Sequence, residues 1–335
     1  MIRPLAAIPF PACVALVLAG LLLSCGPGAP AIVPTPATTE PAAGYDDLAR
    51  HYAPVIYQGA ASDQDYITSV DMDNDWIGSN NWENQPAGDL SAYVYSSVIE
   101  TESHWFLFYS LFHPHDYTDE PCAESDGCHE NDMESLQVMV AKDGTAYGRP
   151  LALFTLAHSH IYLYPIGDSV KKGTLRLQRQ AQLEDGHPLV WVETFGHGIY
   201  GKAEILVPGK VTYRVGDRAE IPDGIKDDDV RYELVSIYDT LWQHRREVGP
   251  GRLFDQPFDY RGQSLPASFD GVDWGEDKAN PPWAYNQDIG ETLLRGDFFL
   301  DPAKAVSTFA TFEGELSRTY LHNPFLADLG LDLAP

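Results

Sequence analysis

The chain has 335 residues and is strongly acidic, with 49 Asp and Glu residues against 22 Lys and Arg residues and a net charge of −27. Nucleic-acid binding depends on basic contacts to phosphates, so this balance argues against a nucleic-acid partner and against broad attachment to anionic lipid. A surface of this sign attracts cations. Hydrophobic residues make up 44% of the chain, enough for a large core, and 28 Gly and 25 Pro supply many turns.

The first 24 residues are typical of a signal peptide, because the basic Arg3 is followed by the apolar run Val14–Leu23, which is too short to span a membrane. Leu22-Leu23-Ser24-Cys25 resembles the bacterial lipobox, which implies a mature protein that begins at Cys25 and is lipidated there. Gly26 follows instead of the Asp associated with inner-membrane retention. The expected location is the bacterial cell envelope, lipid-anchored, at the outer membrane if the source has one. The alternative is an ordinary signal peptide cut elsewhere.

Residues 25–44 are rich in Pro, Ala and Thr without a periodic apolar face, which predicts a disordered tether. Residues 45–335 then form the folded part. It opens with a short helix at Tyr45–Tyr52 and a strand at Val55–Tyr57. Further strand-like runs follow at Ala92–Ile99, Trp105–Phe112, Leu136–Ala141, Pro150–Ala157, His160–Tyr164, Thr174–Arg179, Leu189–Phe195, Lys210–Val215 and Arg231–Ile237.

Many short strands without intervening helices predict an all-β fold, a single β-sandwich of jelly-roll type. A few peripheral helices are expected, at Tyr238–Val248 and from about Pro302 to Tyr320. The competing architecture has two smaller domains, divided at the charged, turn-rich stretch Gly216–Asp229.

An early acidic stretch places Asp71, Asp73 and Asp75 at alternate positions, as in a calcium loop. Trp76 and Trp82 stand where an EF-hand needs Gly and Glu, so the stretch is not an EF-hand. We interpret it as a polar loop packed by the two tryptophans, with a cation site of another type as the alternative.

Two cysteines, Cys122 and Cys128, bracket the sequence A-E-S-D-G. In an oxidising envelope they are expected to form a small disulfide loop that fixes the approach to His129. The alternative is a thiolate metal site, which the lack of further cysteines disfavours.

The most informative stretch is H-E-N-D-M-E at 129–134. If a strand runs from Glu134 to Ala141, Asp132 and Glu134 continue the apolar row Leu136, Val138, Val140 on one face. Two buried carboxylates side by side need compensation by a metal ion, an Arg or a shared proton. A divalent cation is the economical interpretation, with His129 turned toward the same point and His113, His115 and Asp116 upstream as further candidates. The alternative is a solvated strand entrance or an Arg pair.

This stretch resembles the H-x-H-D-W-E core of the necrosis-inducing, NLP-type cytolysins, and F-H-P-H-D before it is similar to their aromatic-x-P-x-D segment. The resemblance implies cation ligands at Asp116, His129, Asp132 and Glu134. Cys128, Asn131 and Met133 depart from that pattern. Mostly hard oxygen ligands favour Ca²⁺, Mg²⁺ or Mn²⁺ over Zn²⁺, unless more imidazoles join.

A second resemblance covers more of the chain. Y-A-P-V-I-Y at 52–57, H-E-N-D-M-E, H-P-L-V-W-V-E-T-F-G-H-G-I-Y at 187–200 and D-F-F-L-D-P-A at 297–303 are similar to the vacuolar-sorting-related family of eukaryotes and bacteria. This resemblance implies a fold and a site more than a reaction.

Histidines suggest two functions for such a site. His158 and His160 continue the row Phe154, Leu156 and are expected to point into the mouth of the sandwich, and His197 lies between glycines. Their alternative role is as histidines satisfied by hydrogen bonds within the fold. The first function is a binding module that holds a glycan or lipid headgroup with the cation and aromatic residues (Tyr109, Tyr117, Tyr162, Trp191). The second is a metal-dependent hydrolase in which His158, His160 or His197 moves a proton.

Overall fold

The computed structural model describes residues 42–122, 127–201, 208–274 and 278–331. The predicted signal peptide, the lipidation site Cys25 and nearly all of the predicted tether lie outside the described residues. All of these described residues belong to one compact unit. None of the helices in the described part of the chain is long and apolar enough to cross a membrane.

The strands have the following bounds: β1 Val55–Ala60, β2 Tyr93–Thr101, β3 His104–Asp116, β4 His129–Ala141, β5 Arg149–Ala157, β6 His160–Pro165, β7 Val170–Gly173, β8 Arg176–Leu177, β9 Gln182–Glu184, β10 His187–Val192, β11 Ile199–Tyr200, β12 Gly209–Val215, β13 Val230–Ser236, β14 Pro257–Tyr260, β15 Gln263–Pro266, β16 Ala310–Phe312 and β17 Tyr320–His322. The α-helices are short: α1 Tyr45–His51, α2 Asn81–Asn84, α3 Asp297–Leu300, α4 Pro302–Phe309 and α5 Pro324–Asp328. The 3₁₀ helices are η1 Asp63–Asp65, η2 Gly78–Asn80, η3 Gln85–Ala87, η5 Leu241–His244 and η6 Pro282–Ala284.

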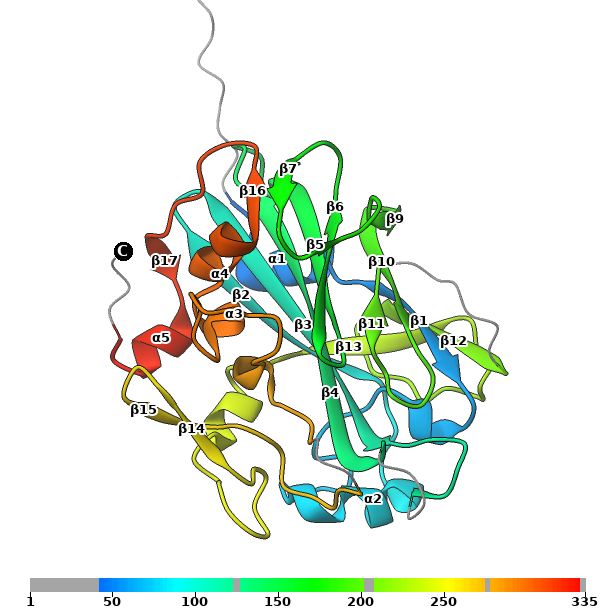
Figure 1. The fold of residues 1–335 in the computed structure, drawn as a ribbon. Coiled ribbons are helices and arrows are strands. Elements are labelled where there is room, and N and C mark those ends of the chain that lie inside the picture. The colour runs from blue at the N-terminus through cyan, green and yellow to red at the C-terminus, as the bar shows by residue number, and fades with distance from the viewer. Residues whose placement is uncertain (1–41, 123–126, 202–207, 275–277, 332–335) are drawn as a thin grey trace, which may run out of the picture. The chain divides into compact units, whose positions relative to one another are not determined.

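Thirteen of the described strands form one mixed, curled sheet in the order β11-β10-β1-β12-β13-β2-β3-β4-β5-β6-β8, with β9 beside β10 and β17 beside β2. Its centre, from β2 to β6, is antiparallel, whereas β1 pairs with β10 and β13 with β2 in parallel. The prediction of a mostly β protein with few helices is confirmed. The jelly-roll sandwich is not confirmed, because the long strands join one continuous sheet (Figure 1).

The central strands β3 and β4 are buried on both faces. This suits the nearly continuous apolar run of β3 from Trp105 to Phe112, whereas the first half of β4 is mostly polar. On one face Leu136, Val138 and Val140 join a core built around β1, β12 and α1. On the opposite face Phe108 and Met139 join a second core with the helices α3, α4 and α5 of the C-terminal part (Figure 1). The face predicted for the Leu136–Val140 row is therefore correct.

Two predicted helices are wrong in extent. Residues 238–248 consist of turns around the short η5. The C-terminal helix ends at Phe309, and residues 310–312 form β16, which pairs with β7. The backbone leaves the helix after Phe309 and continues as an extended strand of apolar and β-branched residues. Both Phe309 and Phe312 pack into the core in this conformation.

Candidate functional site

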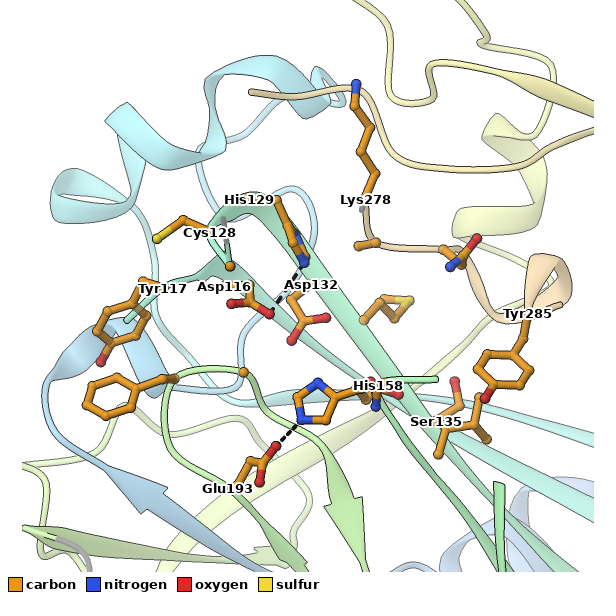
Figure 2. A pocket seen from close by; sticks show the side chains of 18 of the residues that line it. Asp116, Tyr117, Cys128, His129, Asp132, Ser135, His158, Glu193, Lys278 and Tyr285 are labelled. Carbon is orange, nitrogen blue, oxygen red and sulfur yellow. Dashed lines mark hydrogen bonds and ion pairs between the residues drawn. The ribbon is translucent and has the colours of Figure 1, made fainter. Parts of the chain in front are cut away.

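The candidate site lies where β4 extends beyond the end of its neighbour β5. Antiparallel pairing between these strands begins at Leu136 and Thr155, so residues 129–135 are unpaired on that side, apart from one bridge between His129 and Asp273. A pocket of about 480 Å³ opens along this edge (Figure 2). Side chains from both faces of β4 line it, because the strand edge runs through the pocket.

The start of β4 is held by polar contacts on its two sides. The Glu130 carboxylate accepts hydrogen bonds from the backbone N–H of Trp82 (2.7 Å) and Val272 (2.9 Å). Asn131 has a φ of 60°, and its amide donates to the backbone oxygens of Gly78 and Asp270. Asn and Asp tolerate this left-handed backbone better than other non-glycine residues. The edge is therefore fixed before any ligand arrives.

All four residues expected to bind a cation, Asp116, His129, Asp132 and Glu134, line this one pocket. His129 Nε2 lies 3.4 Å from Asp116 Oδ2, and its Nδ1 donates to the backbone oxygen of Asn131 at 2.6 Å. The strand expected from Glu134 to Ala141 begins earlier, at His129. His129 therefore belongs to β4 and pairs with Asp116 of β3, because the hairpin extends beyond the apolar run.

The electrostatics of the pocket reflect crowded acidic groups. Burial, and then the nearby Asp132, raise the pKa of Glu134 well above its usual value, and they also raise the pKa of Asp116. Burial opposes the charged form of His129, but Asp116 and Asp132 outweigh it and raise its pKa to about 9. Asp132 and Glu134 are only 6% and 7% exposed. The pocket thus concentrates negative charge in a poorly solvated place.

Behind the pocket, His197 is buried between two carboxylates. Its Nδ1 lies 2.9 Å from Asp132 Oδ2 and its Nε2 lies 3.2 Å from Asp65 Oδ1. Burial opposes protonation, but the two carboxylates outweigh it and raise the pKa of His197 to about 10. With both ring nitrogens occupied, His197 orients Asp132 and has no free nitrogen to exchange a proton with a ligand.

Asp65 was not identified from the sequence. It is fully buried, and its carboxylate accepts hydrogen bonds from the hydroxyl of Tyr117 (2.7 Å) and from the backbone N–H of Ala61 (2.7 Å) and Phe195 (2.8 Å). These contacts fasten the 193–198 loop to β1 and β3. The one local signal is the capping box that begins at Ser62.

A second set of candidate cation ligands shares Asp132. His113, Asp132 and His197 offer ligand atoms that all lie within 4.8 Å of one another, and all three are buried. The two imidazole rings stack at 3.7 Å with an angle of 7° between their planes, and His113 Nε2 faces Gln58 Oε1 at 3.3 Å. Burial lowers the pKa of His113 well below its usual value, so this ring is neutral. The described residues therefore contain a possible His/Asp metal site, and its metal is not defined by the geometry.

His158 and His160 do not continue one row, so this part of the prediction is wrong. Residues 158 and 159 form the tight turn between β5 and β6, and His158 has a φ of 53°. His158 lines the pocket, where its ring pairs with Glu193 and its backbone N–H donates to Glu134 at 2.8 Å (Figure 2). His160 does not line the pocket and lies 3.2 Å from Asp288. The turn breaks the alternation on which the prediction depended.

The four aromatic residues expected around the ligand do not all lie in the pocket. Tyr117 lines the pocket. The residues Tyr109, Tyr162 and Trp191 do not, and Tyr109 is fully buried with its hydroxyl on the backbone oxygen of Ala49. The disulfide between Cys122 and Cys128 is confirmed, with 5.5 Å between the Cα atoms, and Cys128 lines the pocket beside His129.

Two further features complete the surroundings. Residues 278–282 and Tyr285 form the wall opposite the cation-ligand candidates, which was not predicted. The Asp71–Asp75 stretch is a turn in which Asp73 accepts from Asn84 and Asp75 from Asn80, in agreement with a polar loop. Upstream, His115 stacks on Trp82 at 3.9 Å and is outside the pocket lining.

No family model matches the chain, and no curated protein matches it. Among solved structures, similarity is found to a "toxin fold for microbial attack and plant defense" (18% identity, 52% of this chain and 74% of that chain, TM-score 0.32) and to NLPPya in complex with glucosamine (19%, 52% and 73%, TM-score 0.31). It is also found to Necrosis and Ethylene inducing Protein 2 from the causal agent of cocoa's Witches Broom disease (15%, 63% and 84%, TM-score 0.32). At TM-scores below 0.5, these similarities do not assign a fold or an activity to this chain.

Proposed function

We propose that the domain binds a divalent cation through Asp116, His129, Asp132 and Glu134 and uses it to hold a polar ligand. The observation that carries the proposal is the crowding of these carboxylates in one pocket where imidazoles, rather than Lys or Arg side chains, are their cationic partners. Among the described lining residues there is no arginine, and Lys278 lies 2.9 Å from Asp255 and 3.6 Å from Asp273. Burial, and then repulsion from Asp132, raise the pKa values of Asp116 and Glu134, and a cation from solution would relieve that repulsion.

The composition of the ligand set bears on the choice of metal. Three carboxylates and one imidazole are mostly hard oxygen donors, which suit Ca²⁺, Mg²⁺ or Mn²⁺. The alternative set of His113, Asp132 and His197 offers two imidazoles and would suit Zn²⁺ better. Both nitrogens of His197 already face carboxylates, which favours the first set.

The pocket has room for a ligand, which supports the ligand-binding part of the proposal. The volume of about 480 Å³ is within the usual range for small-molecule sites. We propose a glycan or a lipid headgroup, whose oxygens are suited to a hard cation. The motif resemblance to the NLP-type cytolysins supports this choice, and the glucosamine and mannosamine complexes concern other proteins.

The second candidate is a metal-dependent hydrolase at the same site. Its support is His158, a pocket-lining imidazole whose pKa the Glu193 carboxylate raises to about 9, against the opposing effect of burial. Of the three histidines considered for proton transfer, it is the one with its ring on the pocket.

Elemental analysis and calorimetric titration with Ca²⁺, Mg²⁺, Mn²⁺ and Zn²⁺ test the cation, and glycan, lipid-headgroup and ester panels with and without chelator separate binding from hydrolysis. We expect a hard cation and chelator-sensitive binding. Stoichiometric Zn²⁺ that survives loss of Glu134 but not of His113 would favour the alternative ligand set. A protein that binds none of the cations would refute the proposal.

We further propose that Cys25 carries the lipid that anchors the domain to the cell envelope through residues 25–44. The support is the lipobox-like sequence before Cys25. Cys25→Ser should move the protein from the membrane fraction to the soluble fraction. Unchanged fractionation would contradict the anchor without affecting the cation site.

A further inference from the structure

The pocket reaches both faces of β4. Asp132 and Glu134 point to one face, and Met133 and Ser135 therefore point to the other, since side chains alternate along a strand. On that second face the wall is Lys278–Pro282 together with Tyr285, and Lys278 is paired with Asp255 and Asp273. This wall lies far along the chain from the H-E-N-D-M-E stretch and has no part in either motif resemblance.

Tyr285 is the polar side chain of this wall that lacks a partner. The residue is 6% exposed, and its hydroxyl has no hydrogen-bond partner among the described residues. A buried hydroxyl without a partner destabilises the fold. Figure 2 shows the hydroxyl directed from the wall into the pocket. A partner supplied by a ligand would remove this cost.

The position of Tyr285 is fixed by the surrounding fold. Its ring belongs to the apolar core on this face and packs near Phe298, with 6.5 Å between ring centroids. The preceding helix η6 begins with Pro282, and Arg295 donates to the backbone oxygens of Ala284 (2.7 Å) and Ala267 (2.8 Å). The hydroxyl is therefore held in place before a ligand arrives, which lowers the entropy cost of recognition.

The chemistry of this wall selects an uncharged group. Met133, Leu156, Pro281 and Pro282 present apolar surface to the pocket. Burial raises the pKa of Tyr285, so its phenol remains protonated at neutral pH and acts as a donor. A charged group would be desolvated against these apolar neighbours, whereas a hydroxyl can accept from Tyr285.

We propose that Tyr285 is a ligand-recognition residue whose hydroxyl donates a hydrogen bond to an uncharged polyhydroxylated group bound across β4 from the cation. The inference rests on the proposed cation site, because neighbouring hydroxyls of the same group reach the ion. It adds to that site a specificity determinant from the C-terminal wall.

The test compares the full chain with Tyr285→Phe and with Tyr213→Phe, a matched deletion of a buried tyrosine hydroxyl that is outside the pocket lining. Calorimetry first measures Ca²⁺, Mg²⁺ and Mn²⁺ binding. The cation-loaded proteins are then titrated with myo-inositol, an uncharged polyol, and with glycerol 3-phosphate, a charged one. Melting curves establish that each variant is folded.

We expect Tyr285→Phe to keep the cation affinity within twofold and to lose about 3- to 10-fold in inositol affinity, the range for one hydrogen bond. Glycerol 3-phosphate should not depend on Tyr285, and Tyr213→Phe should behave as wild type. Cation-loaded wild type that does not bind inositol, or binds it equally after Tyr285→Phe, would overturn the inference and leave the cation site standing. A more than tenfold loss of cation affinity in Tyr285→Phe would also overturn it. Wild type that binds no cation would instead refute the proposed function.

Discussion

The molecule contains two clusters of buried carboxylates that are compensated in different ways. In the C-terminal part, Asp297 is fully buried and accepts hydrogen bonds from Lys304 Nζ (2.6 Å), Tyr260 (3.0 Å) and Arg261 (3.3 Å). Arg261 also pairs with Asp301. In the pocket, Asp116, Asp132 and Glu134 face one another with imidazoles as their closest cationic partners.

This difference separates a structural cluster from a binding site. At Asp297 the chain supplies its own permanent positive charges, from Arg261 and Lys304. At the pocket it supplies titratable rings, open volume and carboxylates that repel one another. Burying charged groups without fixed opposite charges is energetically costly. Such groups are typical of sites where a ligand or an ion supplies the missing charge.

The largest effect is expected from breaking the structural cluster. Asp297→Ala leaves Arg261 and Lys304 without their shared carboxylate, which should lower the free energy of unfolding by about 3 kcal/mol. This is the low end for a buried pair, because the two basic side chains are 28% and 27% exposed. Denaturant unfolding should give the same loss with and without chelator. A loss that depends on chelator would contradict the separation of the two clusters.

Asp132→Asn tests the pocket cluster, because Asp132 belongs to both candidate ligand sets and pairs with His197. We expect cation affinity to fall by about 100-fold, at or beyond the upper range for supporting residues around a metal. Calorimetric titration measures it. Asp288→Asn is the matched control, since Asp288 also faces a histidine but lies outside the pocket lining, and it should leave cation binding unchanged.

The pH dependence of the chelated protein should follow the pocket rather than Asp297. Folding raises the pKa of Glu134 above its usual 4.5, and the pKa values of His129 and His197 to about 9 and about 10 from 6.5. Groups with raised pKa values hold more protons in the folded state, so they stabilise it below their unfolded pKa and lose that contribution as pH rises.

Chelated protein should therefore lose stability as pH rises from about 6.5 toward 10, the range in which the raised pKa values of His129 and His197 act. Below pH 6.5 the lowered pKa values of His113 and His115 act in the opposite direction to Glu134. Burial opposes the charged form of Asp65, but contacts with His197, Phe195 and Tyr117 outweigh it and lower the pKa of Asp65 below its usual 3.8. Asp65 therefore acts in the opposite direction, but only in stronger acid. Denaturant unfolding from pH 6.5 to 9 measures this trend. Added cation should flatten it, and a chelated protein that becomes more stable between pH 6.5 and 9 would contradict it.

Glu134→Gln should give the smallest change. Gln retains an oxygen that can accept from the backbone N–H of His158, as Glu134 does now, but removes one of the repelling charges. Cation binding should weaken by about tenfold. The melting temperature should shift less on chelation than in wild type. An equal shift would mean that Glu134 does not face the ion.

The part of the site that could be predicted from the sequence lies on one hairpin. Asp132 and Glu134 are two residues apart on β4, and strand alternation alone places them on one face. His129 and Asp116 are register partners across β3 and β4. Local periodicity and a short motif were enough here, because the four side chains depend on a single pairing.

The remaining residues depend on distant pairings that periodicity does not contain. Asp65 and His197 meet because β1 pairs with both β10 and β12, and Tyr285 belongs to a turn held by Arg295. The positions of most strands were predicted correctly. Their arrangement in one sheet was not, because it depends on these same distant pairings. The turn at His158 and Ser159 was missed because it contains neither Gly nor Asn, the usual signals of a tight turn.

The unpaired edge of β4 also has a consequence for solubility. Exposed strand edges invite edge-to-edge association between protein molecules, and natural proteins protect them with charged side chains or with covering segments. Here residues 130–135 are all buried although they lack a strand partner on this side, and residues 272–274 cover the start of the edge through backbone contacts to Cys128 and Glu130. The surroundings of the pocket thus keep the unpaired edge away from other protein molecules.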